Sequence, residues 1–250
     1  MPFKLTVVAS DSEFDELVRC EFDAYENPQC NLKNLFFPIQ GSSPTARDAA
    51  IQDAVKRQIH WHRSDPSSQW IKVIDVESGK IVGAACWHIY ETNPYTVTSD
   101  EECNWWPTGE ARNIANALMG QFLVPRMTYM NKPHITNNPI TCSVLDICFT
   151  HPTYRRRGVG NMLMEWGVQK AEEKNLESYI DATEIGRELY SKWGFVEGRQ
   201  REFTLASFPE TPKRNELNEL LLPFVWWPMY RPVGGKYEEN KGLFPWDKNW

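Results

Sequence analysis

A loop of arginines and glycines contains the residues whose types and spacing are best suited to chemistry. It lies between Ser143–Phe149, an apolar run typical of a buried strand, and Gly158–Lys174, whose apolar residues recur on one helix face. In order, the loop contains Arg155, Arg156, Arg157, Gly158, Val159 and Gly160. Unpaired N–H groups at a helix start bind phosphate oxygens, and glycines let the backbone approach them closely. The loop therefore predicts an anion-binding site, although two glycines and solvated arginines also suit a simple strand-to-helix turn.

Several classes of protein are disfavoured by the motifs and the composition. The loop lacks the third glycine of a Rossmann fingerprint and the Gly-Lys-Ser/Thr of a P-loop. A formal net charge of −6 argues against non-specific binding to nucleic acid or anionic lipid, because both depend on clustered positive charge. No apolar run approaches membrane-spanning length, and the first residues lack the features of a secretory signal. We expect a cytoplasmic protein without nucleic-acid or membrane partners.

The cysteines give no sign of a disulfide framework or a metal site. They are scattered, with no CxxC pair and no metal-ligand spacing, at Cys20, Cys30, Cys86, Cys103, Cys142 and Cys148. We expect reduced thiols, some of them buried in strands as small apolar residues, and no bound metal.

The rest of the sequence predicts a mixed order of strands and helices that positions the loop. Apolar runs with strand character occur at Phe3–Val8, Trp70–Val76, Lys80–Tyr90, Ser143–Phe149, Ser178–Asp181 and Phe195–Leu205. One helix is expected to begin at an N-cap near Ser10, and a second, separate helix contains Ile51 and Ile59 on one face. Further helices are expected at Glu110–Tyr129, Gly158–Lys174 and Glu184–Lys192. We expect a loop over residues 27–44, and one domain of residues 1–250 in which 208–250 form an irregular wrap rich in aromatics and proline.

Two motifs in this order resemble one known family. Arg155-x-x-Gly158-x-Gly160 after a strand resembles the Q/R-x-x-G-x-G/A signature of the GNAT acetyltransferases, and Tyr190 precedes Gly194-Phe195 as in a later motif of that family. The resemblance extends over roughly residues 3–205, and the Trp- and Pro-rich C-terminus is similar to small-molecule members from fungi. It implies an α/β (α+β) GNAT fold, with a central mixed, mostly antiparallel sheet, splayed parallel strands and flanking helices.

The resemblance also implies acetyl-CoA as co-substrate, held where two parallel strands splay apart. Backbone amides near Phe149 and Thr150 would bond pantetheine or polarise the thioester carbonyl, and amides after the arginines would hold the pyrophosphate. The expected cofactor-binding set is Phe149, Thr150, Arg155, Arg156, Arg157, Gly158, Val159, Gly160 and Asn161.

Two residues are expected to be catalytic by the same resemblance. Tyr190 stands where the family has the acid that protonates the departing thiolate, and tyrosine is protonated at neutral pH. Asp146 is the expected general base, as a carboxylate in an apolar strand on a face shared with Val144 and Cys148. The alternatives are a core tyrosine and a structural carboxylate paired with an arginine or a backbone amide.

The acceptor site is less clearly marked. Trp105, Trp106 and the helix Glu110–Tyr129 fall where family members line that site, although aromatic residues usually serve packing. A single histidine is also more often a packed or solvent-facing residue than a functional one. With two histidines included, the expected substrate-binding residues are His88, Trp105, Trp106 and His134. The expected function is acetyl transfer from acetyl-CoA to a small-molecule amine by direct attack, in a monomer or homodimer. The alternatives are a protein or peptide amine acceptor, a longer acyl donor or alcohol acceptor, and a non-catalytic acyl-CoA-binding protein.

Overall fold

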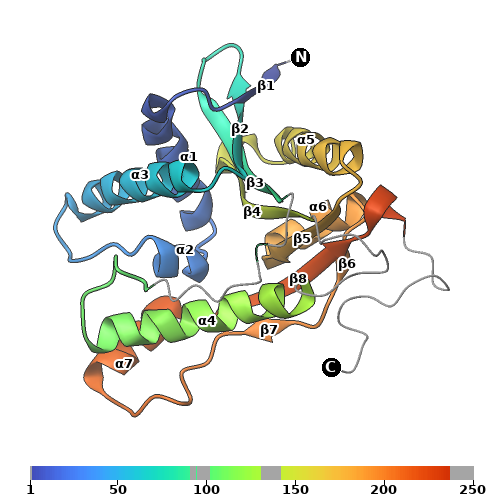
Figure 1. Ribbon diagram of the computed structural model, residues 1–250. Helices are drawn as coiled ribbons and strands as arrows, with labels where there is room; N and C mark the ends of the chain where they lie inside the picture. Colours follow the sequence, from blue (N-terminus) through green and yellow to red (C-terminus); the bar gives the residue numbers. More distant parts are fainter. Residues whose placement is uncertain (1, 91–93, 95–101, 131–141, 237–250) are drawn as a thin grey trace.

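A computed structural model describes residues 2–90, 94, 102–130 and 142–236. Within these residues, one eight-stranded sheet runs through the molecule in the order β1-β2-β3-β4-β5-β8-β6, and β7 pairs with β8 (Figure 1). All pairs are antiparallel except β4 with β5, which confirms the expected mixed sheet. The strands are β1 Phe3–Val7, β2 Ser68–Asp75, β3 Ile81–Tyr90, β4 Cys142–Thr150, β5 Glu177–Ala182, β6 Val196–Glu197, β7 Arg201–Glu202 and β8 Val225–Arg231.

Helices cover both faces of the sheet, with α1 and α3 on one side and α5 and α6 on the other (Figure 1). Helix α7 packs against α2 and α4. Alternate residues of the strands enter two cores, as for Trp70 toward α1 and α3 and Ile71 toward α5. The helices are α1 Phe14–Glu26, α2 Asn31–Phe36, α3 Ala46–Ser64, α4 Glu110–Met130, α5 Val159–Glu173, α6 Glu184–Lys192 and α7 Pro212–Leu221.

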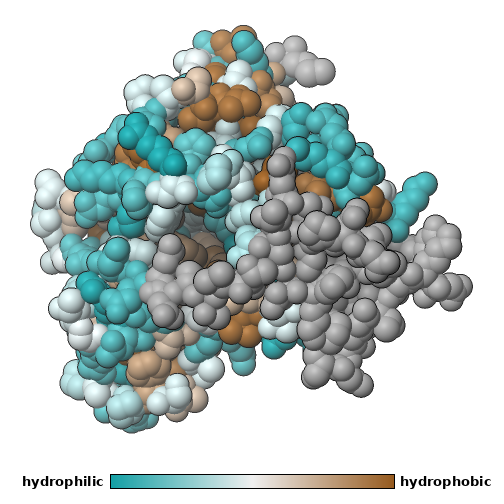
Figure 2. All heavy atoms as spheres, viewed as in Figure 1, coloured by the Kyte–Doolittle hydropathy of each residue, from teal (hydrophilic) through white to brown (hydrophobic). Residues whose placement is uncertain are grey.

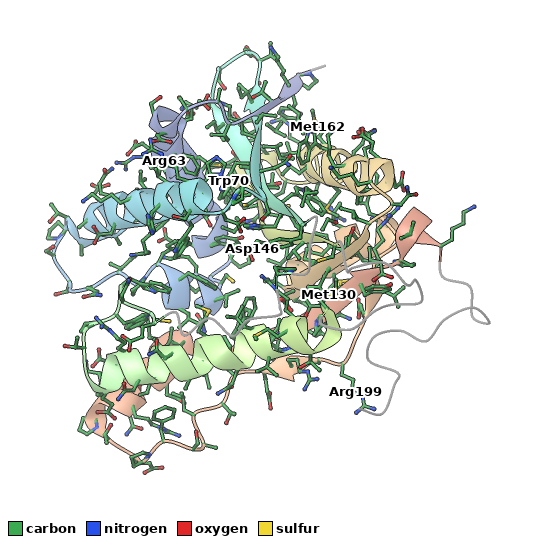
Figure 3. The ribbon with its side chains drawn as sticks, in the orientation of Figure 1. Arg63, Trp70, Met130, Asp146, Met162 and Arg199 are labelled. Atoms are coloured by element: carbon green, nitrogen blue, oxygen red, sulfur yellow. The ribbon has the colours of Figure 1, made fainter. Side chains whose placement is uncertain are left out.

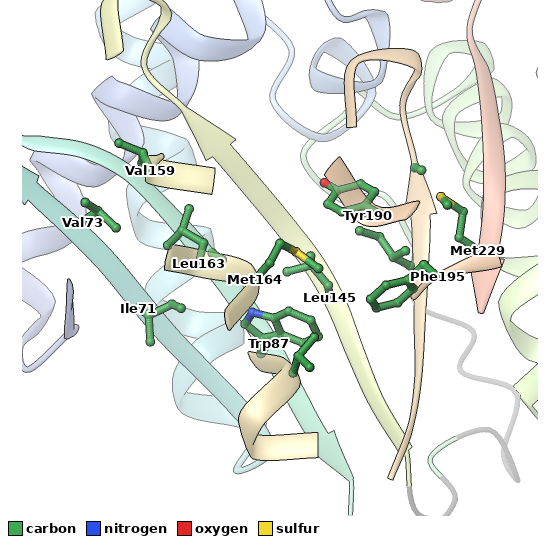
Figure 4. Packing of buried hydrophobic residues seen from close by; sticks show 14 of the residues in the cluster. Ile71, Val73, Trp87, Leu145, Val159, Leu163, Met164, Tyr190, Phe195 and Met229 are labelled. Atoms are coloured by element: carbon green, nitrogen blue, oxygen red, sulfur yellow. The ribbon is translucent and has the colours of Figure 1, made fainter. Parts of the chain in front are cut away.

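Helix α5 lies unusually close to the sheet because it has a glycine where it crosses β3. A Cβ at Gly167 would lie 1.9 Å from Cε2 of the Trp87 indole, so no other residue fits there. Trp87 is fully buried, and Figure 4 shows it beneath Leu163 and Met164 of α5, beside Leu145 of β4. This packing fixes the start of α5 relative to the end of β4.

Strands β4 and β5 pair over only part of their length. The ladder joins Cys142–Leu145 to Glu177–Ile180 and ends there, although β4 continues to Thr150. Asp146 lies at this point and is the extra residue of a β-bulge, since Cys86 pairs with Ile147 and Trp87 with Leu145. The two parallel strands therefore diverge beyond the bulge, as the sequence predicted.

Three secondary-structure expectations were wrong. Residues 27–44 include a helix, α2, whose six residues are too few to show a helical period. The strand expected at Phe195–Leu205 is reduced to the two-residue strands β6 and β7. Residues 208–250 are not an irregular wrap throughout, because α7 and β8 lie within them and β8 pairs with β5 inside the sheet. Pro228 obscured this strand in the sequence, since proline is rare within sheets.

The remaining strands and helices lie where the sequence placed them, to within a few residues. All six cysteines are free thiols, in line with the absence of a disulfide pattern. In the part of the chain that the structure describes, none of the helices has the length and apolar character needed to cross a bilayer.

Candidate active site

A cleft of about 550 Å³ opens where β4 and β5 diverge. Its walls come from the end of β4, the loop before α5, one side of α6, the end of α1 with the following loop, and residues 223–225 before and at the start of β8. The molecular surface is also hollowed near the middle of the face seen in Figure 2, with apolar atoms on the floor of the hollow. The cleft brings together segments from both halves of the sequence.

One end of the cleft is formed by the N-terminus of α5. Gly158, Gly160 and Asn161 line it, and α5 starts at Gly158 without a side-chain cap. Gly158 has φ of +94°, a conformation that is strained for any residue with a Cβ. The first N–H groups of a helix have no acceptor within the helix, and they carry the positive end of its dipole. This end of the cleft is therefore built to receive an anion.

The three arginines of the loop have different tasks. Arg155 donates to the backbone oxygens of Thr150 at 3.2 Å and Ala24 at 2.7 Å, so its guanidinium joins β4 to α1. Arg157 lies over the rings of Phe3 and Tyr154, 5.0 Å from each centroid. The side chain of Arg156 is 84% exposed, has one long 3.4 Å contact with Glu188, and belongs to a residue that lines the cleft. Arg156 is thus the arginine of the three that is available to an incoming anion.

The predicted acid Tyr190 lines the cleft and lies against Cys148 of β4. The residue is 7% exposed, and burial together with the neighbouring thiol holds the pKa of its hydroxyl well above the ordinary value. Figure 4 shows its ring on α6, with the hydroxyl directed toward β4. Gly186, one turn earlier, makes room for this ring, because a Cβ there would lie 2.5 Å from Tyr190 Cε2.

The backbone register of β4 decides which groups face the cleft. The His151 N–H donates to the Val82 oxygen at 2.9 Å. In an antiparallel ladder every second residue of a strand forms hydrogen bonds with the same neighbouring strand. Phe149, two residues before His151, therefore also forms its hydrogen bonds with β3. Cys148 and Thr150 then point their backbone groups toward the divergence. The Cys148 oxygen accepts a long 3.4 Å bond from the Tyr25 hydroxyl. Phe149 lines the cleft but turns its backbone groups to β3, so Cys148 and Thr150 are the residues whose amides face the divergence. The side chains of Phe149 and Val159 are buried in the cores.

The predicted base Asp146 is held by an arginine. Arg126 Nη1 lies 2.8 Å from Asp146 Oδ1, and Arg126 Nη2 lies 3.1 Å from Asp181 Oδ2 (Figure 3 labels Asp146). Burial acts to raise the pKa of Asp146, but Arg126 and then His88 lower it on balance. The pKa of Asp181 is raised to about 6 by burial. Asp146 is therefore an ionised carboxylate paired with an arginine, which was the alternative to a base.

The bulge also changes which side chains share a face with Asp146. Val144 packs with Met130 of α4, on the face from which Arg126 reaches Asp146. Cys148 packs on the opposite core, with Tyr190. The expectation that all three β4 residues share one face was therefore wrong, because the extra residue of a bulge reverses the alternation.

The expected acceptor residues do not line the described cleft. His88 Nδ1 lies 3.1 Å from Asp65 Oδ2, and although burial acts to lower its pKa, Asp65 raises that pKa to about 10. Trp105 and Trp106 both donate their indole N–H to the Leu35 oxygen, at 2.9 Å and 2.8 Å, and so join the core. His134 lies outside the described residues.

Helix α1 supplies two residues that the sequence did not mark. Tyr25 lines the cleft, and Glu21, one turn earlier, is 1% exposed. Glu21 Oε2 accepts from Gln58 Nε2 at 2.6 Å, and burial raises the pKa of Glu21 to about 8. No sequence motif marks either residue, because their burial and their neighbours are determined by the packing of α1 on the sheet.

Comparisons with known proteins agree with this fold. Residues 130–197 match the family model described as "Acetyltransferase (GNAT) domain". No curated protein matches the sequence significantly. Among solved structures, arylalkylamine N-acetyltransferase 2 from Aedes aegypti is 14% identical, covers 93% of this chain and 100% of its own, and has a TM-score of 0.60.

Two further structures have the same architecture. A polyamine N-acetyltransferase from Drosophila melanogaster is 14% identical, with 91% of this chain and 98% of that chain covered and a TM-score of 0.58. A protein from Corynebacterium glutamicum described as "histone acetyltransferase HPA2 and related acetyltransferase" is 18% identical, with coverages of 93% and 97% and a TM-score of 0.52. At such low sequence identities, the solved structures establish that the fold is shared. The match to the family model concerns residues 130–197, which contain both sequence motifs. Residues 130–197 therefore match the GNAT acetyltransferase family, and the chain shares the fold of solved acetyltransferases.

Proposed function

We propose that this protein transfers the acetyl group of acetyl-CoA to the amine of a small molecule. One observation carries the proposal: the uncapped start of α5 and the Tyr190 hydroxyl line the same cleft, which opens where β4 and β5 diverge. An anion site and an O–H donor in one cleft suit a cofactor with a pyrophosphate and a reacting thioester. The names of the Aedes and Drosophila structures, an arylalkylamine and a polyamine N-acetyltransferase, support a small amine as acceptor.

The residues present fit acetyl-CoA in three places. Backbone amides of Val159, Gly160 and Asn161 would hold the pyrophosphate, with Arg156 adding a mobile positive charge. Backbone groups of Cys148 and Thr150 would bond the pantetheine arm in place of the missing β5 partner. The same amides would polarise the thioester carbonyl, since donors aimed at a developing oxyanion lower its energy.

The proposed reaction has one bond-forming and one bond-breaking step. The neutral amine nitrogen bonds to the carbonyl carbon, and the carbon–sulfur bond then breaks to leave a thiolate. Tyr190 supplies the proton that the thiolate takes up, and its raised pKa keeps the hydroxyl protonated at neutral pH. The proton of the amine has to leave before or during attack. That Asp146 takes it stays a prediction, and its pairing with Arg126 makes it a weak base.

Purified protein with acetyl-CoA and a panel of amines provides the test. Release of free CoA thiol, followed with a thiol reagent, should depend on the amine, and calorimetry should show binding of CoA. Binding without turnover on any amine would favour a non-catalytic acyl-CoA-binding protein. If neither binding nor turnover is found, the anion site at the start of α5 has been assigned wrongly.

A further inference from the structure

The backbone oxygen of Cys148 lies where β4 has lost its parallel partner. The ladder between β4 and β5 ends at Leu145 and Ile180, whereas β4 continues to Thr150. Because Phe149 forms its hydrogen bonds with β3, the backbone groups of Cys148 point to the other side, toward the divergence. In a continuous sheet an amide of β5 would donate to this oxygen. The donor is instead a side chain of α1.

Tyr25, near the end of α1, is this donor. Its hydroxyl oxygen lies 3.4 Å from the Cys148 oxygen, which is longer than the ordinary O–H donor distance of roughly 2.5–3.0 Å. The ring meets Phe149 edge to face, with centroids 6.2 Å apart, and Tyr25 and Cys148 both line the cleft. The Tyr25 backbone oxygen accepts from the Cys30 N–H at 2.7 Å. Tyr25 is therefore held firmly by its backbone and ring, and only weakly by its hydroxyl.

The surroundings of the Tyr25 hydroxyl keep it a donor. Burial raises the pKa of this hydroxyl well above its ordinary value, and the nearby Glu21 raises it further, so the group is protonated at neutral pH. Tyr25 packs in the core beside α1, whereas Tyr190 packs in the core beside α5 and hydrogen-bonds to the Cys148 thiol. Two tyrosines from opposite faces of the sheet therefore meet Cys148, one at its backbone oxygen and one at its thiol.

We propose that Tyr25 is a positioning residue of the cofactor site, whose hydroxyl holds the Cys148 oxygen until an amide N–H of the pantetheine arm takes its place. The inference rests on the proposed function, in which that arm bonds the backbone of Cys148 and Thr150. A strand carbonyl bonds an amide N–H at about 2.9 Å, so the pantetheine amide is the better donor of the two. The exchange keeps a donor on this oxygen with and without the cofactor, and so avoids the cost of a buried acceptor that is left unpaired.

The exchange predicts that the Tyr25 hydroxyl opposes the binding of CoA. The bond from Tyr25 to Cys148 has to break when the pantetheine amide takes the oxygen, and Tyr25→Phe removes this bond in advance. We therefore expect the dissociation constant of CoA to fall about two- to tenfold in Tyr25→Phe, the factor that one net hydrogen bond gives. The nucleotide half of CoA, 3′-phosphoadenosine 5′-diphosphate, has the pyrophosphate and no pantetheine amide. Its dissociation constant should be unchanged, and calorimetry with both ligands measures the difference.

Tyr230→Phe is the matched control. Tyr230 is also a buried tyrosine, 6% exposed, and its hydroxyl hydrogen-bonds to Glu177. It lies in β8 and is not among the residues that line the cleft. Because the substitution removes a buried hydroxyl outside the cleft, it should change the affinity for neither ligand. A thermal melt of each variant shows whether both proteins remain folded.

The outcomes separate the inference from the proposed function. An unchanged or weaker affinity for CoA in Tyr25→Phe would overturn the inference, because the hydroxyl would then serve packing or share the oxygen with pantetheine. An equal gain for the nucleotide half would overturn it as well, since the effect would lie at the start of α5. Wild-type protein that binds neither ligand refutes the proposed function and the inference together. If no amine is turned over but Tyr25→Phe shows the expected gain for CoA, acetyl transfer is refuted and the exchange at Cys148 stands.

Discussion

The position of the Tyr190 ring can be tested by a substitution on α6 that keeps the tyrosine itself and lies outside the candidate anion site at the start of α5. In Gly186→Ala the new methyl would lie 2.5 Å from Cε2 and 3.0 Å from the hydroxyl oxygen of Tyr190, so the ring has to move by about 1 Å to restore contact distance. A displacement of about 1 Å at a reacting group costs roughly 100-fold in rate, and an acid contributes about 100-fold or more. We expect kcat to fall about 10- to 100-fold.

Stability should not follow activity in this variant. Alanine is favoured over glycine in a helix by up to about 1 kcal/mol, which offsets the cost of moving the ring. Gly120→Ala is the matched control, because Gly120 lies in α4 and a Cβ there would meet nothing within 4 Å. It should raise Tm by about 2–4 °C and leave kcat unchanged. Steady-state CoA release and a thermal melt of both variants give the comparison. A Gly186→Ala enzyme with kcat within about twofold of wild type would refute the role assigned to Tyr190.

Three further substitutions have defined expectations. Tyr190→Phe should lower kcat about 100-fold and leave the acetyl-CoA dissociation constant unchanged, as measured by calorimetry; an unaltered kcat would remove it as the acid. Arg156→Gln should raise that dissociation constant about three- to tenfold, since an exposed charge contributes about 1 kcal/mol, and the exposed Arg199→Gln should not. Burial raises the pKa of Glu21 to about 8 in the folded protein, against an ordinary value of 4.5. As the pH rises between these values, Glu21 ionises in the unfolded chain before it ionises in the folded one, so the free energy of unfolding falls. Glu21→Gln should therefore raise Tm, by more at pH 8 than at pH 5, and a gain independent of pH would contradict the burial argument.

Local patterns in the sequence were sufficient to predict the strand, loop and helix of the candidate anion site and most elements around it. The strand, the glycines and the amphipathic helix that form this site are consecutive, so 31 residues contain the whole signal, from Ser143 to Glu173. Tyr190 could be found because its motif is also local. Its placement beside Cys148 follows from the packing of α6 against β5 and β8, and no spacing along the chain reveals it.

The cleft wall at residues 28–31 and 223–225 could not be predicted, because it is made from segments that are distant in sequence. Asn31 and Pro223 are 192 residues apart in sequence, and their hydrogen bond joins the start of α2 to the segment that leads into β8. The bulge at Asp146 was also beyond reach, since a single extra residue in a strand leaves no mark on an apolar run. Trp105 and Trp106 were placed in the acceptor site on their position in the chain, whereas their indole N–H groups are turned to a backbone oxygen of α2.

The place of β8 in the sheet bears on how the molecule matures. Val225–Arg231 is the last strand among the described residues, yet it pairs with β5 inside the sheet, and the residues that lead into it line the cleft. During synthesis the earlier strands leave the ribosome first, and contacts between distant residues form late. The anion site at the start of α5 has all its local parts long before the opposite wall exists. A nascent chain can therefore form the start of α5 and the end of β4 well before the cleft between them and β8 is complete.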